Sequence, residues 1–175
     1  MVSGFLKNAF GRISVSFLVL LLFAFVFSAQ AADVKEVEGF KEAAKATVHT
    51  AAVGLGAILK NVKTDKEGID IIRTFTTPVR FYPDNSGYFY AYDFDCVNIA
   101  HATQKDLEGK NLYDHKDTKG KYVIRELSAA AKKGGGFVEF YWAKPGEKSG
   151  EFRKLGYVEP IPGTKFFIGT GVYLP

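Results

Sequence analysis

Apolar and polar positions alternate along residues 87–101, GYFYAYDFDCVNIAH. A period of two is typical of a half-buried β-strand. One side of this predicted strand carries a row of aromatic rings: Tyr88, Tyr90, Tyr92 and Phe94. The alternation stops at Asp95 and Cys96 and resumes up to His101. The segment therefore predicts an antiparallel hairpin with phenolic hydroxyls on one face and a histidine at its end.

Three segments have apolar residues at spacings of three and four, which is typical of amphipathic helices. They are residues 34–62, 65–75 and 121–133. We expect Asp65 to cap the second helix and Asp117 or Thr118 to cap the third, because their side chains accept hydrogen bonds from free N–H groups at a helix start. The long first helix covers a sheet or, alternatively, pairs with its copy in a dimer.

Three further segments are predicted to be strands, separated by turns rich in Gly and Pro. They are residues 137–142, 151–159 and 165–173. Together with the hairpin they give a five-stranded antiparallel sheet whose faces the helices must cover. The predicted fold class is therefore α+β, with a long N-terminal helix and shorter covering helices.

The N-terminus has the pattern of a secretory signal peptide. Lys7 and Arg12 precede an apolar run over residues 17–27, which is shorter than the ~20 residues that a membrane-spanning helix needs. A small-residue A-x-A site follows this run. We therefore expect residues 1–31 to be removed and residues 32–175 to form one exported domain, either periplasmic or secreted.

Composition and motifs narrow the function further. The formal charge of +4 falls to +2 without the two leader cations, which does not favour a nucleic-acid partner. Cys96 is the only cysteine, so no internal disulfide forms. There is no GxSxG, phosphate-loop, HExxH or CxxC motif, and the spacing of Asp114, His115 and Asp117 fits no calcium loop. We therefore expect no enzyme activity, no metal and no cofactor.

Three cations lie among aromatic residues of the predicted strands: Arg80, His101 and Lys154. A guanidinium or ammonium group can bind a planar carboxylate, while tyrosine hydroxyls and a histidine donate to its remaining lone pairs. Arg80 is the expected main anchor, with Tyr88 and Tyr90 as hydroxyl donors. Each cation also has a simpler interpretation, namely a surface arginine, a core histidine and a solvated strand lysine.

The phase of the strands decides which side chains can share this pocket. Lys154 and Tyr157 point to opposite sides of their strand, so only one of them can line a pocket on one face of the sheet. We choose Lys154, because the small Gly156 on the same face leaves space. Tyr141 is in phase with Phe137 and is expected to add a wall, although core packing explains it equally well.

Several motifs occur in the order found in one known family. They are GYFYAYD, EGKNLYDHKDTKGKYVIREL, GGGFVEFYWAKPG and KLGYVEPIPGTKFFIGTGVYL. Over residues 34–174 the chain resembles the single Cache domain, the short PAS-like form, of extracytoplasmic bacterial sensors. The resemblance implies a PAS-like antiparallel sheet beside a long N-terminal helix, with a small pocket that binds a short organic acid. It also favours Arg80 as a ligand contact.

Members of this family normally lie between the membrane helices of chemoreceptors or histidine kinases, whereas this chain ends after GVYLP. We therefore expect a stand-alone domain that binds a small carboxylate and reports to a separate membrane receptor, sensor kinase or transporter. The alternative is a ligand-independent accessory module that dimerises through its long helix. The chain departs from the family at Asp95 and Cys96, where the turn often has a glycine, and at Ala102, where a proline is common.

Overall fold

The structure is a computed structural model that describes the backbone of residues 15–174 and the side chains of residues 35–174. Within the expected signal peptide, residues 1–31, the structure describes only the backbone of residues 15–31. Residues 1–14 and all side chains of this segment lie outside the described residues. The chain divides into two compact units, Met1–Gly39 and Phe40–Pro175. In the part of the chain that the structure describes, no helix is long and apolar enough to cross a membrane.

Helix α1, Val15–Leu59, begins well before the predicted residue 34. Residues 15–38 contain neither Gly nor Pro, so nothing in this stretch favours a helix end. In the second unit the C-terminal part of α1 buries an apolar stripe against the sheet, with Val48 and Leu55 fully enclosed. The predicted role of this helix as a cover for the sheet is thereby confirmed.

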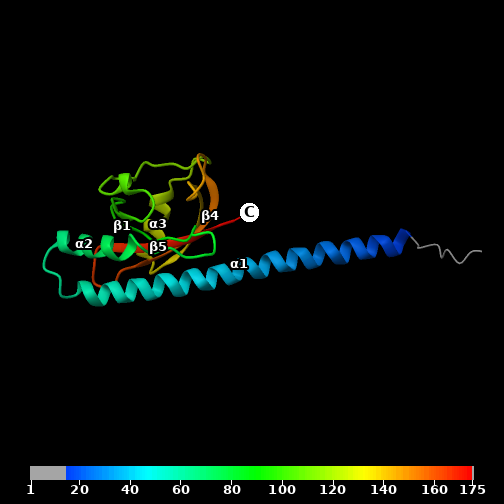
Figure 1. Cartoon of the computed structure of the whole chain (residues 1–175), viewed down its shortest axis with the longest axis horizontal. Helices are drawn as coiled ribbons and strands as arrows, with labels where there is room; N and C mark the ends of the chain where they lie inside the picture. Colours follow the sequence, from blue (N-terminus) through cyan, green and yellow to red (C-terminus); the bar gives the residue numbers. More distant parts are fainter. Residues whose placement is uncertain (1–14, 175) are drawn as a thin grey trace, which may run out of the picture. The chain divides into compact units, whose positions relative to one another are not determined.

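The second unit contains the predicted five-stranded antiparallel sheet, in the order β2-β1-β5-β4-β3 (Figure 1). The strands are β1 (Tyr90–Asp93), β2 (Asn98–His101), β3 (Gly136–Trp142), β4 (Phe152–Pro160) and β5 (Phe166–Tyr173). The last strand, β5, lies between β1 and β4 and pairs with both. The hairpin therefore lies beside the C-terminal strand, and the predicted α+β class with a PAS-like sheet is confirmed.

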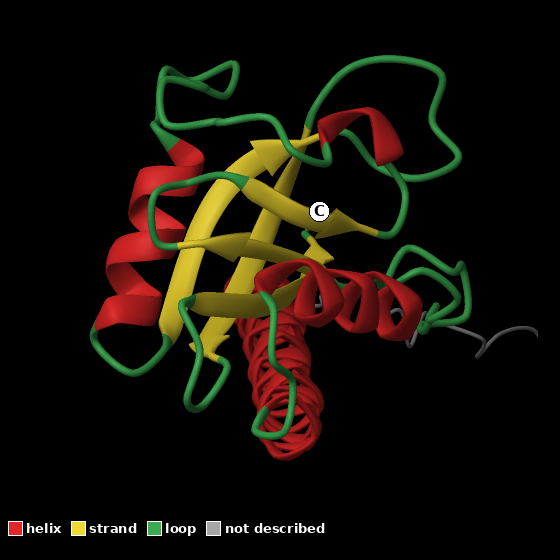
Figure 2. Ribbon diagram, turned by 90° about the vertical axis from the view of Figure 1, so that its left-hand side faces the viewer, coloured by secondary structure: helices red, strands yellow, loops and turns green. Residues whose placement is uncertain are grey.

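Helices cover both faces of the sheet (Figure 2). On one face, Phe89, Ala91 and Ile168 pack with the buried stripe of α1. On the other face, the aromatic row that begins at Tyr88 packs with α3 (Val123–Lys132). The two sides of the hairpin are therefore divided as the alternation predicts, and the tyrosine row faces α3.

Helix α2, Asp65–Thr76, has the predicted position but a different cap. Thr64 is the N-cap, because its backbone is extended and its hydroxyl accepts a hydrogen bond from the N–H of Glu67 at 3.2 Å. Asp65, which the sequence favoured as the cap, is already inside the helix and pairs with Lys165. The prediction was wrong by one residue because both Thr and Asp can cap a helix.

Helix α3 begins at Val123, two residues after the predicted start, and its N-cap Tyr122 makes no capping bond through its side chain. Asp117 does not cap it. Instead, the buried carboxylate of Asp117 accepts hydrogen bonds from the N–H groups of Lys119, Lys121 and Tyr141 at 2.9, 2.9 and 3.0 Å. Burial opposes ionisation, but these backbone donors lower the pKa of Asp117 overall. The carboxylate therefore ties the loop before α3 to strand β3.

The turn of the hairpin lies where the alternation stops. Asp93 Oδ1 accepts hydrogen bonds from the N–H groups of Asp95 and Val97 at 3.0 and 2.8 Å. Cys96 has a φ of 68°, which is the left-handed region that favours glycine. Cys96, at the turn where the family often has a glycine, therefore adopts a glycine-like backbone conformation.

Candidate ligand-binding site

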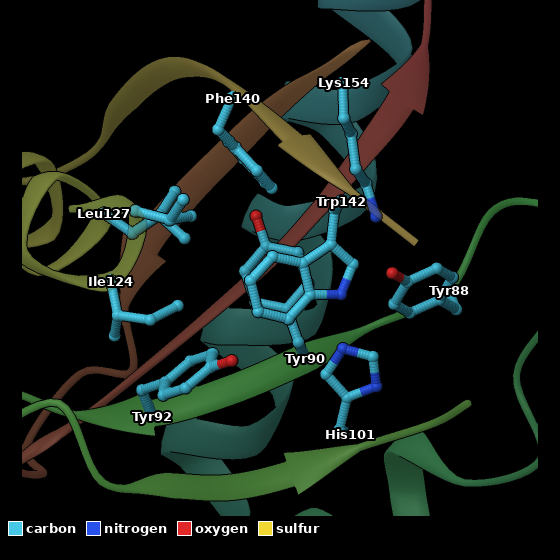
Figure 3. Close-up of a pocket in the computed structure, with 10 residues that line it drawn as sticks. Tyr88, Tyr90, Tyr92, His101, Ile124, Leu127, Phe140, Trp142 and Lys154 are labelled. Carbon is cyan, nitrogen blue, oxygen red and sulfur yellow. The ribbon is translucent and has the colours of Figure 1, made fainter. Parts of the chain in front are cut away.

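A small cavity, with about 10 Å³ open to the centre of a water-sized sphere, lies between the sheet and α3 (Figure 3). Its polar lining comes from Tyr88, just before β1, and from the strand residues Tyr90, Tyr92, His101 and Lys154. Its apolar lining comes from α3 and β3: Val123, Ile124, Leu127, Phe140 and Trp142. One wall can therefore bind a polar group while the other packs against carbon.

Lys154 reaches this cavity from β4 and is only 1% exposed. Its Nζ lies 3.9 Å from the centre of the Tyr88 ring and 4.7 Å from that of Tyr173. Within the described residues, no carboxylate oxygen lies within ion-pair distance, 4.0 Å, of this nitrogen. Burial holds the pKa of Lys154 well below its usual value. The side chain is thus an amine without a counter-ion, and a carboxylate would supply one.

The space for the lysine comes from a different glycine than the sequence suggested. A Cβ added at Gly156 would lie 2.7 Å from Phe140 Cε1 and 2.8 Å from the Tyr90 hydroxyl, so that space is already filled. A Cβ added at Gly171 would instead lie 2.9 Å from Lys154 Cε. Gly171 on β5 therefore makes room for the lysine stem, and Gly156 makes room for two rings of the pocket.

Two tyrosines of the row already have protein partners. The Tyr88 hydroxyl lies 3.3 Å from that of Tyr173, and the Tyr90 hydroxyl donates to the carbonyl of Thr170 at 3.2 Å. Burial raises the pKa of Tyr88 and of Tyr90 well above the usual value, so both remain neutral. These rings act as uncharged walls whose hydroxyls are held in place by β5.

His101 is buried at the end of β2 and its ring is fixed by the loop that follows. Its Nδ1 accepts a hydrogen bond from the N–H of Gln104 at 3.0 Å, which leaves Nε2 as the protonated nitrogen. Burial, and then the charge of Lys154, lowers the pKa of His101 to about 3. The imidazole is therefore neutral at physiological pH and can donate one hydrogen bond through Nε2.

Trp142 completes this wall, because its Nε1 donates to Gln104 Oε1 at 2.7 Å and its ring stacks 6.2 Å from that of His101. Gln104 therefore orients both rings from outside the pocket. Trp142 and Tyr92 were not among the residues that the sequence singled out. Strand alternation could have identified both residues. Tyr92 lies on the same side of its strand as Tyr88, and Trp142 lies on the same side as Phe140.

The structure does not place Arg80 in the lining of the cavity. Its side chain is exposed, and its guanidinium donates to the carbonyl oxygens of Thr77, Val79 and Ala102 at 3.0, 2.7 and 2.6 Å. Its charge is close enough to lower the pKa of His101. Arg80 therefore ties the segment before the hairpin to the end of β2 and acts on the pocket only at a distance.

Tyr141 lies on the opposite face of β3 from the cavity, because Phe140 and Trp142 on either side of it line the pocket. Lys119 Nζ lies 5.3 Å from the centre of its ring. Of the six predicted site residues, the structure brings four together and leaves Arg80 and Tyr141 outside. The four are Tyr88, Tyr90, His101 and Lys154.

No three His, Cys, Asp or Glu side chains of the described residues gather closely enough to hold a metal ion. The acids of the loop before α3 have other partners. Asp114 pairs with Arg125, and Asp117 binds backbone N–H groups.

Comparison with known proteins agrees with the geometry. Residues 40–175 match the dCache_2 family model, which describes a Cache domain. Sensor histidine kinase MctS of Rhizobium johnstonii is 43% identical over 89 residues, which are 50% of this chain and 19% of the kinase. The methyl-accepting chemotaxis protein CtpM of Pseudomonas aeruginosa is 31% identical over 88 residues, 50% of this chain and 16% of that protein. The matches thus span less than a fifth of the length of these two relatives.

Two solved structures cover nearly the whole domain. A methyl-accepting chemotaxis protein from Vibrio parahaemolyticus has a TM-score of 0.71 and 34% identity, covering 82% of this chain and 94% of that chain. A Cache chemosensory domain, solved to explain its recognition of a carboxylic acid, has a TM-score of 0.61 and 28% identity, covering 84% and 96%. These relatives are sensory, ligand-binding domains of chemoreceptors. Because the family match covers most of the chain and the fold agrees, the chain belongs to the Cache domain family of extracytoplasmic sensors.

Proposed function

We propose that this domain binds a short monocarboxylic acid in the cavity, with the carboxylate held by Lys154 and His101. The observation that carries this proposal is the buried lysine, which has aromatic rings around it and no carboxylate nearby among the described residues. A buried charge needs a partner, and an anionic guest provides it. The neutral His101 adds one hydrogen bond to a second oxygen.

The size of the cavity limits the guest. The space open to the centre of a water-sized sphere is about 10 Å³, room for roughly one water molecule, so lining side chains must move apart to admit an acid. The apolar wall of α3 packs against a short carbon chain rather than against a second charge. An acid of about five non-hydrogen atoms gains at most ~7.5 kcal/mol, which corresponds to a dissociation constant of a few micromolar.

We further propose that the domain is exported and reports binding to a membrane partner, which is a receptor, a sensor kinase or a transporter. The support is that similar domains belong to a sensor histidine kinase and to methyl-accepting chemotaxis proteins. The signal-peptide pattern of residues 1–31 agrees with an extracytoplasmic location.

Calorimetry with acetate, propionate and butyrate on the purified chain tests the binding proposal. The Lys154→Met variant keeps the length of the buried side chain but removes the amine, so it should bind none of the three. Lys66→Met, at an exposed lysine of α2, is the matched control and should bind like the wild type. Circular dichroism verifies that each variant is folded. Unchanged affinity in Lys154→Met would remove Lys154 from the site.

A second candidate, a module that dimerises through α1, is favoured by one observation. Val53 and Ile58 are 49% and 55% exposed on the part of α1 that belongs to the domain, and Phe75 of α2 is also exposed. A second copy of the chain would cover this apolar face. Light scattering on the wild type and on Ile58→Glu tests it, since a dimer that dissociates in the variant supports this candidate and a wild-type monomer rejects it.

A further inference from the structure

We propose that Tyr92 and Asn98 form a second polar end of the cavity that recognises an oxygen substituent on the guest. The site would then prefer hydroxy- or oxo-monocarboxylic acids over unsubstituted acids of equal length. This inference rests on the proposed function, since it concerns the same cavity.

The first observation is the amide of Asn98. This side chain is 0% exposed, and both Nδ2 and Oδ1 lack a hydrogen-bond partner among the described residues. The backbone of Asn98 has its own partners, since its N–H donates to Lys110 and its carbonyl accepts from Gly109, at 2.9 and 2.8 Å. The fold therefore does not use the amide, although leaving such a group unpaired is unfavourable.

The second observation is the position of this amide. Asn98 on β2 pairs with Tyr92 on β1, after an irregularity in the register between Ala91 and Tyr92. Burial raises the pKa of Tyr92, and the proximity of the Asn98 amide opposes this rise, although the geometry between the two groups is not that of a hydrogen bond. The amide and the phenol are therefore neighbours that leave each other's hydrogen-bonding capacity unused.

The third observation is where the Tyr92 hydroxyl points. Figure 3 shows it directed into the cavity from the side of Ile124, while Lys154 enters from the side of Tyr88. The hydroxyls of Tyr88 and Tyr90 have protein partners, but in the described structure no such bond is found for Tyr92. The cavity thus has an amine at one end and an unused phenol with an amide behind it at the other.

The remaining buried side-chain atom without a partner in the described structure belongs to a ring that packs against a lining residue. It is Nε2 of His115, whose ring centre lies 5.0 Å from that of the lining residue Trp142. The three such atoms, two on Asn98 and one on His115, therefore belong to residues that neighbour the lining residues Tyr92 and Trp142.

The chemistry of the second end follows from its groups. A phenol and a carboxamide both donate and accept, so together they can match a hydroxyl or a carbonyl oxygen. A plain alkyl chain would leave them unpaired. Sites built to bond a substrate oxygen discriminate strongly against analogues that lack it, whereas a purely apolar pocket discriminates much less. We therefore expect a preference of about tenfold or more.

Calorimetry on the full chain with propionate, lactate and pyruvate tests the inference, because these acids share a three-carbon chain. The wild type should bind lactate or pyruvate at least about tenfold more tightly than propionate. Asn98→Leu and Tyr92→Phe should each reduce this ratio, because they weaken the binding of lactate or pyruvate more than that of propionate. Tyr141→Phe is the control, because that ring lies on the opposite face of β3 from the cavity and should not affect the ratio.

The outcomes separate the two proposals. If the wild type binds the acids without preference, or if Asn98→Leu and Tyr92→Phe weaken all three equally, the second polar end is refuted and the carboxylate site stands. If no acid binds to the wild type, the proposed function is refuted together with this inference. Because Tyr92→Phe removes one oxygen atom only, the test does not depend on Asn98→Leu being folded.

Discussion

The ammonium nitrogen of Lys154 lies 3.9 Å from the centre of the Tyr88 ring, in a cavity whose other walls are also aromatic or aliphatic. A ring face stabilises a desolvated cation by roughly 2 kcal/mol, which is less than the cost of burying the charge. Burial therefore lowers the pKa of Lys154, and a bound anion would oppose this shift.

Binding of a carboxylate should take up one proton. Burial lowers the pKa of Lys154 in the free domain, and a bound carboxylate would raise it again. At any pH between these two values, the free amine is neutral and the bound one is charged, so affinity should fall as pH rises, by up to about tenfold per unit. Calorimetry in buffers that differ in ionisation enthalpy measures the proton count. A count of zero would contradict this mechanism.

Lys154→Met should stabilise the ligand-free domain. The unfolded chain carries the lysine charge, while burial disfavours that charge in the folded state and lowers the pKa of Lys154, so stability rises with pH up to the unfolded pKa near 10.4. Replacing the amine by an apolar side chain removes this cost. Urea unfolding at pH 7 should give a higher midpoint for Lys154→Met than for the wild type. A lower midpoint would show that the charged lysine has a stabilising partner.

The domain should lose stability in mild acid because of His101. Its pKa is about 3 in the fold and about 6.5 when unfolded, so stability is complete above pH 6.5 and falls as pH decreases towards 3. The loss is about 1.4 kcal/mol per pH unit, or roughly 2 to 3 kcal/mol between pH 6.5 and 4.5. Urea unfolding at these two values measures it. The His101→Gln variant should show a weaker dependence of stability on pH. The control variant His49→Gln, at an exposed histidine, should show the same dependence as the wild type.

Gly156→Ala should damage both the fold and the pocket. The new methyl group would lie 2.7 Å from Phe140 Cε1 and 2.8 Å from the Tyr90 hydroxyl, so two lining rings must move, at a cost of about 1 to 3 kcal/mol. Gly54→Ala is the matched control, because nothing lies within 4 Å of its added Cβ. This helical replacement should stabilise the domain by up to about 1 kcal/mol. Thermal unfolding distinguishes the two, and equal midpoints would refute the packing argument.

Asp117→Asn should loosen the loop before α3. The carboxylate accepts three backbone hydrogen bonds. The amide oxygen of Asn can still accept from Lys119 and Lys121, but its nitrogen cannot accept from Tyr141, so we expect a loss of about 1 to 3 kcal/mol. Hydrogen exchange at Tyr141 should speed up, and that at Lys121 should change less. Asp114→Asn, at an exposed acid of the same loop, is the control and should leave both amides protected. Unchanged exchange in Asp117→Asn would mean that the loop is held by other contacts.

Two residues predicted for the site, Arg80 and Tyr141, do not line the cavity, for different physical reasons. Arg80 is a strong carboxylate binder in principle, but three backbone carbonyls of its own neighbourhood use its donors. Tyr141 was predicted to line the pocket because it lies on the same side of its strand as Phe137. That side of β3 faces away from the pocket. A sequence shows which residue types are available, but it does not show which acceptors a flexible side chain finds first.

The sequence by itself determined the strands, the division of the hairpin into two faces and the placement of Lys154 and Tyr157 on opposite faces, because a period of two assigns each side chain to one side of a sheet. Only the tertiary structure decided that β5 lies between β1 and β4, and that the tyrosine row faces α3. It also decided that the buried lysine and Tyr92, the strand neighbour of Asn98, line the same cavity. These relationships depend on strand order and on packing between segments far apart in the chain, which local periodicity does not encode.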